Sequence, residues 1–175
     1  MAIEIKNSRL IAYISKIQKQ LSPYLHAGYL RQPHIKLAAC GLMTAHSFPV
    51  EILSQQIKAL EQLALTSFAI NIRQLSSFST YPYISISDQT ENITNIHNTL
   101  TSIFPEDNPC QYIPHITLGL YNDAYSYSDI HNDFIKLSKE VKVDSMTVNS
   151  LILAQYKTNS VQGAYQVLHH IPLSL

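Results

Sequence analysis

The sequence predicts an α+β fold built from two similar lobes. Apolar residues recur at three- and four-residue steps in some segments, which is typical of helices, and alternate strictly in others, which is typical of strands with one covered face. The phrase Pro-His-Ile-x-Leu also occurs twice, at residues 33–37 and 114–118. Each lobe would contribute one copy on a strand, and the short alternating strands favour mostly antiparallel sheets.

Four segments carry a helical stripe. In chain order they are residues 9–21, 49–64, 88–103 and 128–139, the last with a weaker and more polar pattern. Pro49 suits the opening of the second helix, and Ala64 ends its buried stripe. Asp88 and Glu91 give the third helix a start that resembles a capping box.

Six segments have the pattern of strands. In chain order they are residues 33–38, 67–73, 83–87, 115–120, 141–154 and 164–171. The last two are expected to form a hairpin around residues 157–163. In the two strands that carry the repeated phrase, the Ile and Leu side chains share one face, so each histidine and the residue two beyond it lie on the other face.

Composition limits the class of protein. With 175 residues, 46% of them apolar and 14% charged, the chain suits a single domain over residues 1–175 with a proper core. Neither a membrane span nor a secretory signal is visible, and Cys40 and Cys110 are too few for a disulfide framework, so we expect a cytosolic protein. Nothing demands a dimer, which favours a monomer.

The charge balance restricts the partners. Lys and Arg number 12, as do Asp and Glu, so the chain has no global field that would attract a long nucleic acid. A polyanionic partner should therefore be short, or held by a local pocket.

The repeated histidines, His34 and His115, carry the chemical signal. They lie 115 − 34 = 81 residues apart, and central strands in adjacent lobes would place one on each wall of a groove. Imidazole titrates near pH 6.5, so one ring can accept a proton while the other donates one. Thr117 can donate a hydrogen bond to a phosphate oxygen, and Lys36 can add a charge-assisted one. The arrangement suits cleavage of a phosphodiester without a metal.

The two phrases resemble the paired His-x-Thr/Ser motifs of the two-histidine (2H) phosphoesterase superfamily. This superfamily includes RNA 2′,3′-cyclic phosphodiesterases, also called 2′-5′ RNA ligases, and 2′,5′-oligoadenylate phosphodiesterases. The resemblance implies a bilobal fold in which two mostly antiparallel sheets are related by a pseudo-twofold axis around a central groove, with helices outside. It also implies His34 and His115 as catalytic acid and base, Thr117 as phosphate ligand, and no metal or cofactor.

Lys36 departs from this pattern, because the residue two beyond the first histidine is Thr or Ser in the family. A lysine keeps a donor and adds charge, but it is longer. A cation beside His34 would favour its neutral imidazole, so His34 is expected to be the base. The departure is equally consistent with a weakened or altered activity.

Four other residues are candidates for substrate binding: Arg31, Tyr29, Tyr83 and Tyr112. Arg31 and Tyr29 precede the first histidine on a loop, where a solvated role is the plainer interpretation. Tyr83 alternates with buried isoleucines and could stack on a base or merely cover the sheet, and Tyr112 is equally ambiguous. The neighbouring histidines at residues 169 and 170 point to opposite faces of a strand and cannot jointly bind a metal.

Three functions are compatible with these features. The favoured one is a metal-independent phosphodiesterase acting on short RNA, an oligonucleotide or a cyclic nucleotide. The second is a non-catalytic module that binds a nucleotide or RNA at a decayed site, with Lys36 as its mark. The third is a protein-interaction domain that uses the outer helices.

Overall fold

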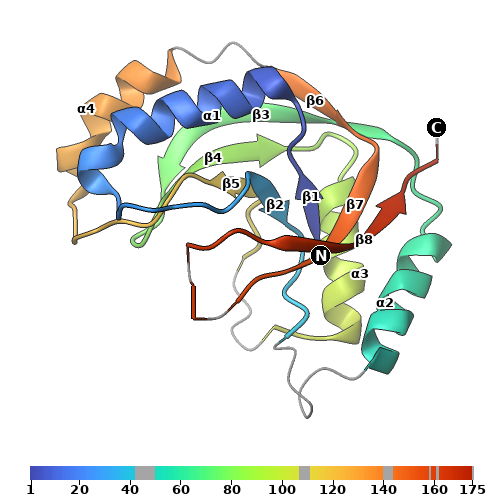
Figure 1. Ribbon diagram of the computed structural model, residues 1–175. Helices are drawn as coiled ribbons and strands as arrows, with labels where there is room; N and C mark the ends of the chain where they lie inside the picture. The colour runs from blue at the N-terminus through green and yellow to red at the C-terminus, as the bar shows by residue number, and fades with distance from the viewer. Residues whose placement is uncertain (42–49, 107–110, 140–143, 158, 161, 175) are drawn as a thin grey trace.

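Helices and strands alternate along the chain largely as the two periodicities predict (Figure 1). The structure is a computed structural model that describes residues 1–41, 50–106, 111–139, 144–157, 159–160 and 162–174. In chain order its elements are β1 (Ala2–Glu4), α1 (Ser8–Gln20), the short 3₁₀ helix η1 (Ser22–Tyr24), β2 (His34–Lys36), α2 (Val50–Gln62), β3 (Phe68–Ser77), β4 (Pro82–Ser87), α3 (Asn92–Ile103), β5 (His115–Thr117), α4 (Tyr127–Ser138), β6 (Ser145–Val148), β7 (Ser150–Gln155) and β8 (Gln166–Pro172).

The strands of the described residues form one eight-stranded sheet in the order β6-β3-β4-β5-β2-β1-β7-β8. Every neighbouring pair is antiparallel, so the predicted α+β class is confirmed. The two expected sheets are instead two halves of one sheet, because β2 and β5 pair with each other at Ile35 and Ile116. This pairing uses strand edges that two separate sheets would leave without partners.

The two halves follow the same backbone pattern around β2 and β5. The carbonyl of Pro33 accepts from the amide of Ile5 at 3.1 Å, and the carbonyl of Pro114 accepts from the amide of Ile86 at 3.0 Å. Farther along the same strands, the amides of residues 37 and 118 donate to the carbonyls of residues 1 and 82, each at 3.0 Å. These equivalent bonds are what a pseudo-twofold relation between the halves requires.

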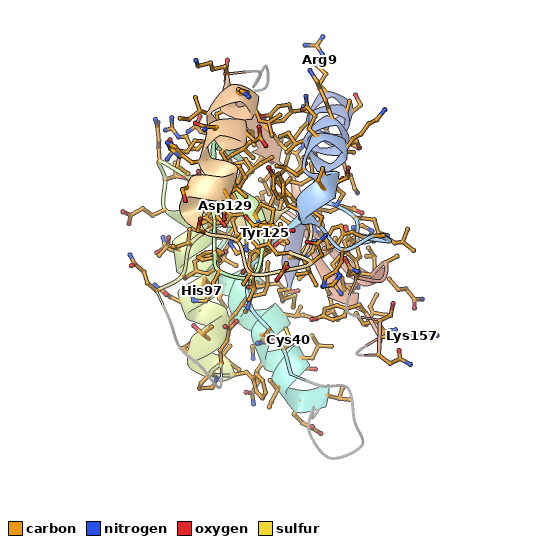
Figure 2. All side chains as sticks on the ribbon, turned by 90° about the vertical axis from the view of Figure 1, so that its left-hand side faces the viewer. Arg9, Cys40, His97, Tyr125, Asp129 and Lys157 are labelled. Carbon is orange, nitrogen blue, oxygen red and sulfur yellow. The ribbon has the colours of Figure 1, made fainter. Side chains whose placement is uncertain are left out.

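The helices cover the isoleucine face of the sheet. A row of aligned residues crosses its centre, and none is more than 7% exposed: Ile3, Ile35, Ile116, Ile84 and Leu75. The buried side chains of α1 and α3 belong to the same core. Helix α1 lies beside α4, and α2 beside α3, so that two helix pairs occupy opposite ends of the molecule (Figures 1 and 2). The opposite face of the central strands is left open.

The strands β6 and β7 follow one another in the chain but lie near opposite ends of the sheet. Only Asn149 separates them, although β6 pairs with β3 and β7 pairs with β1. Thr66 and Ser174 form a further bridge between the two ends. The sheet is therefore curled, because one continuous stretch of chain must reach both of its ends.

Some predicted element boundaries were wrong. Helix α3 begins at residue 92 because Glu91 has a left-handed conformation, and Asp88 accepts from the amide of Ile93 without being part of the helix. Helix α2 ends at residue 62, so Ala64, expected on its buried stripe, is exposed and left-handed at φ 47°. Pro49 lies outside the described residues. The two strands of the repeated phrase are only three residues long, and β1 was not anticipated.

Candidate active site

The repeated phrase places four polar side chains in a square on the open face of the sheet. Because Ile35 pairs with Ile116, the same register sets His34 opposite Thr117 and Lys36 opposite His115 (35 + 116 = 34 + 117 = 36 + 115). All four lie on the face opposite the buried isoleucines. The histidines occupy one diagonal, and diagonal neighbours on paired strands are about 7–8 Å apart, so both rings can reach one tetrahedral group.

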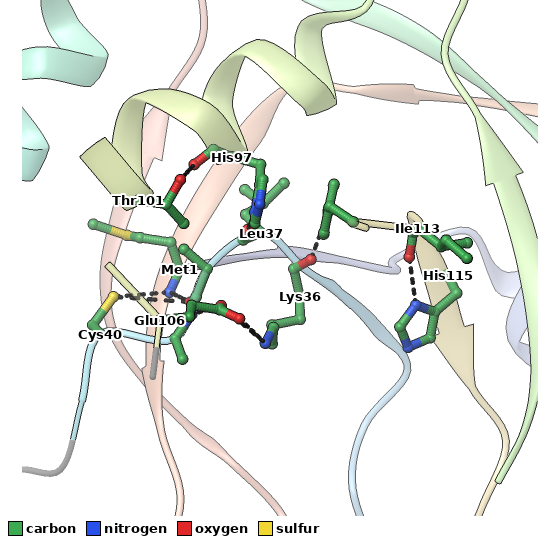
Figure 3. A network of polar contacts seen from close by, with 12 residues as sticks. Met1, Lys36, Leu37, Cys40, His97, Thr101, Glu106, Ile113 and His115 are labelled. Atoms are coloured by element: carbon green, nitrogen blue, oxygen red, sulfur yellow. Dashed lines mark hydrogen bonds and ion pairs between the residues drawn. The ribbon is translucent and has the colours of Figure 1, made fainter. Parts of the chain in front are cut away.

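Each histidine ring is anchored in the same way. Nδ1 of His34 lies 2.9 Å from the carbonyl oxygen of Gln32, and Nδ1 of His115 lies 2.6 Å from that of Ile113 (Figure 3). A carbonyl oxygen only accepts, so Nδ1 carries a hydrogen in both rings and donates it. In each neutral ring, Nε2 is therefore the atom with a lone pair for a substrate proton.

The intervening proline explains this anchor. Residues 33 and 114 are both proline, whose ring fixes φ and leaves no amide hydrogen to compete for a neighbouring carbonyl. The histidine after each proline donates back to the residue before it. The repeated x-Pro-His order was visible in the sequence, but its effect on the imidazole orientation was not inferred from it.

Burial lowers the pKa of both histidines below the ordinary value. Desolvation is the main cause in each case, and the bonds to Gln32 and Ile113 oppose it. Arg31 further lowers the pKa of His34, whereas Lys36 lowers that of His115. The expectation that Lys36 would make His34 the base was wrong in its premise. In the actual register Lys36 faces His115, and each imidazole has its own neighbouring cation.

Lys36 forms an ion pair that the sequence did not predict. Its Nζ lies 3.0 Å from Oε1 of Glu106, and Figure 3 shows its side chain directed toward Glu106 and away from the His115 ring. The Glu106 carboxylate also accepts from the amide of Ala39 at 2.9 Å. These donors hold the pKa of Glu106 below its usual range, although burial acts in the opposite direction. Glu106 follows α3 and is far from Lys36 in sequence, so no local pattern revealed the pair.

Comparison with known proteins identifies the family. The model of the 2′-5′ RNA ligase superfamily matches residues 7–159. The chain belongs to this superfamily. The resemblance to the two-histidine phosphoesterases is thereby confirmed.

Solved structures with low sequence identity share the fold. TT0787 of Thermus thermophilus has 17% sequence identity and a TM-score of 0.63, over 98% of this chain and 95% of that one. E. coli LigT complexed with 3′-AMP has 16% identity and a TM-score of 0.61, over 99% and 96%. Kluyveromyces marxianus Usb1 with uridine monophosphate has 12% identity and a TM-score of 0.54, over 100% and 95%. No curated protein sequence is significantly similar to this chain.

Aromatic rings surround both histidines of this superfamily member. The His115 ring has three aromatic neighbours with centroids 5.2–5.6 Å away, Phe78, Tyr81 and Tyr83. The His34 ring contacts Tyr165 edge-on at 5.3 Å. Sequence reasoning found only Tyr83 among them. The others lie in the connection between β3 and β4 or just before β8, and local periodicity cannot place such segments together.

The remaining predicted substrate contacts lie in different places. Tyr83 is on the open face but only 7% exposed, because Phe78 stacks on it. Arg31 donates to the carbonyl of Gly163 and lies over the Tyr156 ring at 3.8 Å. Tyr29 is half-buried, and burial raises its pKa, with Arg31 and Tyr81 close enough to affect it.

Tyr112 has structural partners. Its hydroxyl donates to the carbonyl of Lys36 at 2.7 Å, and its ring stacks on His97 at 3.9 Å. Burial raises the pKa of this hydroxyl. Through this bond Tyr112 holds the backbone of the strand that carries His34 and Lys36.

A cavity of about 230 Å³ opens beside His34. Arg31, His34 and Lys36 line it together with Tyr156 and Tyr165. Its floor includes Ala2, which packs with Ile152 and Tyr165 in a small apolar cluster separate from the main core.

Neither a metal centre nor a membrane-spanning helix is found among the described residues. In that part of the chain, no three His, Cys, Asp or Glu side chains gather in a way that could hold a metal ion, and residues 169 and 170 are exposed. No helix there has the length and apolar character needed to traverse a lipid bilayer.

Proposed function

We propose that the protein is a metal-independent phosphodiesterase acting on short RNA or nucleotide phosphodiesters, with either a 2′,3′-cyclic phosphate or a 2′,5′ linkage as the reacting group. The observation that carries this proposal is the square of residues on the open face. Its two histidines lie on a diagonal, and both have Nδ1 occupied by a carbonyl. Two Nε2 atoms directed at one phosphate supply the acid and the base that phosphodiester cleavage needs.

The reaction requires one neutral and one protonated imidazole. The neutral Nε2 takes a proton from water when the substrate is a cyclic phosphate, or from a ribose hydroxyl when the product is cyclic. The oxygen so activated forms a bond to phosphorus. The protonated Nε2 gives its hydrogen to the departing oxygen as that P–O bond breaks. The Thr117 hydroxyl, opposite His34, can donate to a non-bridging oxygen. The Lys36 ammonium is paired with Glu106 at the edge of the square and can donate to a phosphate there only by sharing or leaving that carboxylate.

The size and type of substrate follow from charge and from the relatives. The zero formal net charge favours a short substrate over a long duplex. The relatives LigT and Usb1 were solved with 3′-AMP and uridine monophosphate, and these support a nucleotide ligand for this chain as well. Such a ligand also fits the non-catalytic binding module, which is the rival proposal.

Turnover in the presence of EDTA separates the two proposals. We expect hydrolysis of a 2′,3′-cyclic mononucleotide or a 2′,5′-linked oligoadenylate, with kcat/KM falling by about 10²–10⁴-fold in His34→Ala and in His115→Ala. The double variant should be little worse than either single one, because acid and base act as a unit. His169→Ala, an exposed histidine on β8, is the matched control. Tight nucleotide binding without turnover would establish the binding module instead.

A further inference from the structure

The two halves of the open face differ in the size of the side chain at one equivalent position. Ala2 pairs with Lys36 in one half, and Tyr83 pairs with Thr117 in the equivalent position of the other. Tyr83 is buried under Phe78, whose ring lies 4.4 Å from it. A methyl group therefore stands in one half where an aromatic ring stands in the other. The cavity of about 230 Å³ lies on the Ala2 side.

Cationic groups gather at this cavity. Arg31 and Lys36 line it on either side of His34 in sequence, and Arg31 is close enough to lower the pKa of that histidine. The arginine is held in place by its bond to Gly163 and by the Tyr156 ring. In a chain without net charge, these two cationic side chains, one of them paired with Glu106, favour an anion at this cavity.

The Lys36 ammonium is not directed at the centre of the square. It is paired with Glu106, and the side chain is directed toward that carboxylate and away from the His115 ring. The pair is accessible, with 49% of the lysine side chain and 21% of the glutamate side chain exposed. Ion pairs that are so exposed are weak, so a phosphate can share or replace the carboxylate at little cost.

We infer that this cavity binds a second phosphate group of the substrate, held by Lys36 and Arg31, beside the phosphate that reacts between His34 and His115. The inference rests on the proposed function and names its substrate class: a nucleotide that carries a further phosphate. That phosphate is either a 5′-terminal monoester or the next internucleotide diester. Contacts to such phosphates position a nucleotide without reading its base, and Glu106 limits the affinity by competing for Lys36.

Equilibrium binding tests the second phosphate independently of turnover. The probes are adenosine 3′-monophosphate, adenosine 3′,5′-bisphosphate and a 3′-phosphorylated adenine dinucleotide, measured by calorimetry at one ionic strength. We expect the wild-type protein to bind at least one two-phosphate probe about 10-fold or more tightly than the monophosphate, as a charge-assisted hydrogen bond implies. In Lys36→Thr, the ratio of the two affinities should fall to about one, so that the two-phosphate probe binds no more tightly than the monophosphate. Glu106→Gln should increase this ratio, because the competing charge is lost while the size of the side chain is kept.

The opposite signs of these two variants are the decisive result. A general loss of folding would lower affinity for all probes, whereas the inference requires the ratio to fall in one variant and to rise in the other. Lys136→Thr removes a lysine from an ion pair on α4, and Glu61→Gln neutralises an exposed acid on α2, so both serve as controls that leave the ratio unchanged. Equal weakening of all probes by Lys36→Thr, or a ratio that survives it, would overturn the inference.

The two sources of the phosphate are distinguished by the probes. A gain with the bisphosphate indicates a 5′-terminal monoester, and a gain with the dinucleotide alone indicates an internucleotide diester. Turnover of a nucleoside 2′,3′-cyclic phosphate with and without a 5′-phosphate is measured in parallel. If neither of these nor a 2′,5′-linked oligoadenylate is hydrolysed while the binding ratio follows the two variants, the proposed function fails and the second phosphate site stands.

Discussion

At the scale of single residues, the two histidines differ in which cationic side chain is near them. Arg31 lies near His34, and Lys36 lies across the strand pair from His115. Both pKa values are lowered, mainly by burial, so in the folded protein both rings lose their protons below the ordinary value near 6.5. In the proposed mechanism, the assignment of acid and base would therefore depend on small differences between two similar sites.

Substituting the two cations separates these sites. Lys36→Met should raise the pKa of His115, and Arg31→Met should raise that of His34, because each change removes a positive charge that opposes protonation. Titration of the imidazole signals by NMR measures both values directly. A shift of the other histidine in place of the expected one would contradict the pairing of cations and rings.

The same variants assign the catalytic roles. If His115 is the base, Lys36→Met moves the acidic limb of the kcat/KM profile to higher pH, because the base then stays protonated to a higher pH. If His115 is the acid, the basic limb moves to higher pH instead. Arg31→Met should move the other limb.

At the scale of elements, a residue with a strained backbone lies just after the end of α2. Ala64 follows the helix with φ 47°, a left-handed conformation that the alanine Cβ disfavours and that glycine adopts freely. Ala64→Gly should therefore raise the free energy of unfolding by about 0.5–1 kcal/mol, even though glycine is more flexible in the unfolded chain. Urea unfolding measures this change. Ala59→Gly, inside α2, is the matched control and should lower stability by about 1 kcal/mol.

At the scale of the whole molecule, the two halves meet at a narrow seam. Ile35 and Ile116 are fully buried and are the aligned pair between β2 and β5. Ile116→Ala should lower the free energy of unfolding by about 2–5 kcal/mol, since it leaves a cavity beneath the strand that carries His115. Ile116→Val should cost only about 0.5–1.5 kcal/mol. Ile135→Ala on α4, where the side chain is 43% exposed, should cost less than Ile116→Ala in the same denaturant titration.

Local patterns predicted most of the fold. The helices and the longer strands have strong apolar periodicity, because burying one face requires it. The strand β1 was missed because three residues are too few to establish alternation, yet β1 lies beside β2 and carries Ala2 into the cavity. The joining of the halves into one sheet depends on the pairing of Ile35 with Ile116, which no single strand pattern specifies.

Only the part of the candidate site that the repeated phrase supplies could be predicted from the sequence. His34, His115, Lys36 and Thr117 lie on one face, as the alternation in both phrases predicted. Their exact pairing across the seam was not predictable, and for that reason the influence of Lys36 was assigned to the wrong histidine. Glu106, Tyr165 and Phe78 were missed because long-range packing brings them to the site.

The position of β7 in the sheet has a consequence for synthesis on the ribosome. This strand, residues 150–155, lies between β1 at the amino-terminal end and β8 at residues 166–172. The outer edge of β1 is therefore paired only after residues 150–155 have emerged. Such distant contacts slow folding, and the half that carries His34 is completed only after β7 and β8 have been translated. A nascent chain that has not yet reached β6 and β7 would thus leave the outer edges of both β3 and β1 uncovered and open to chaperones or to misassociation.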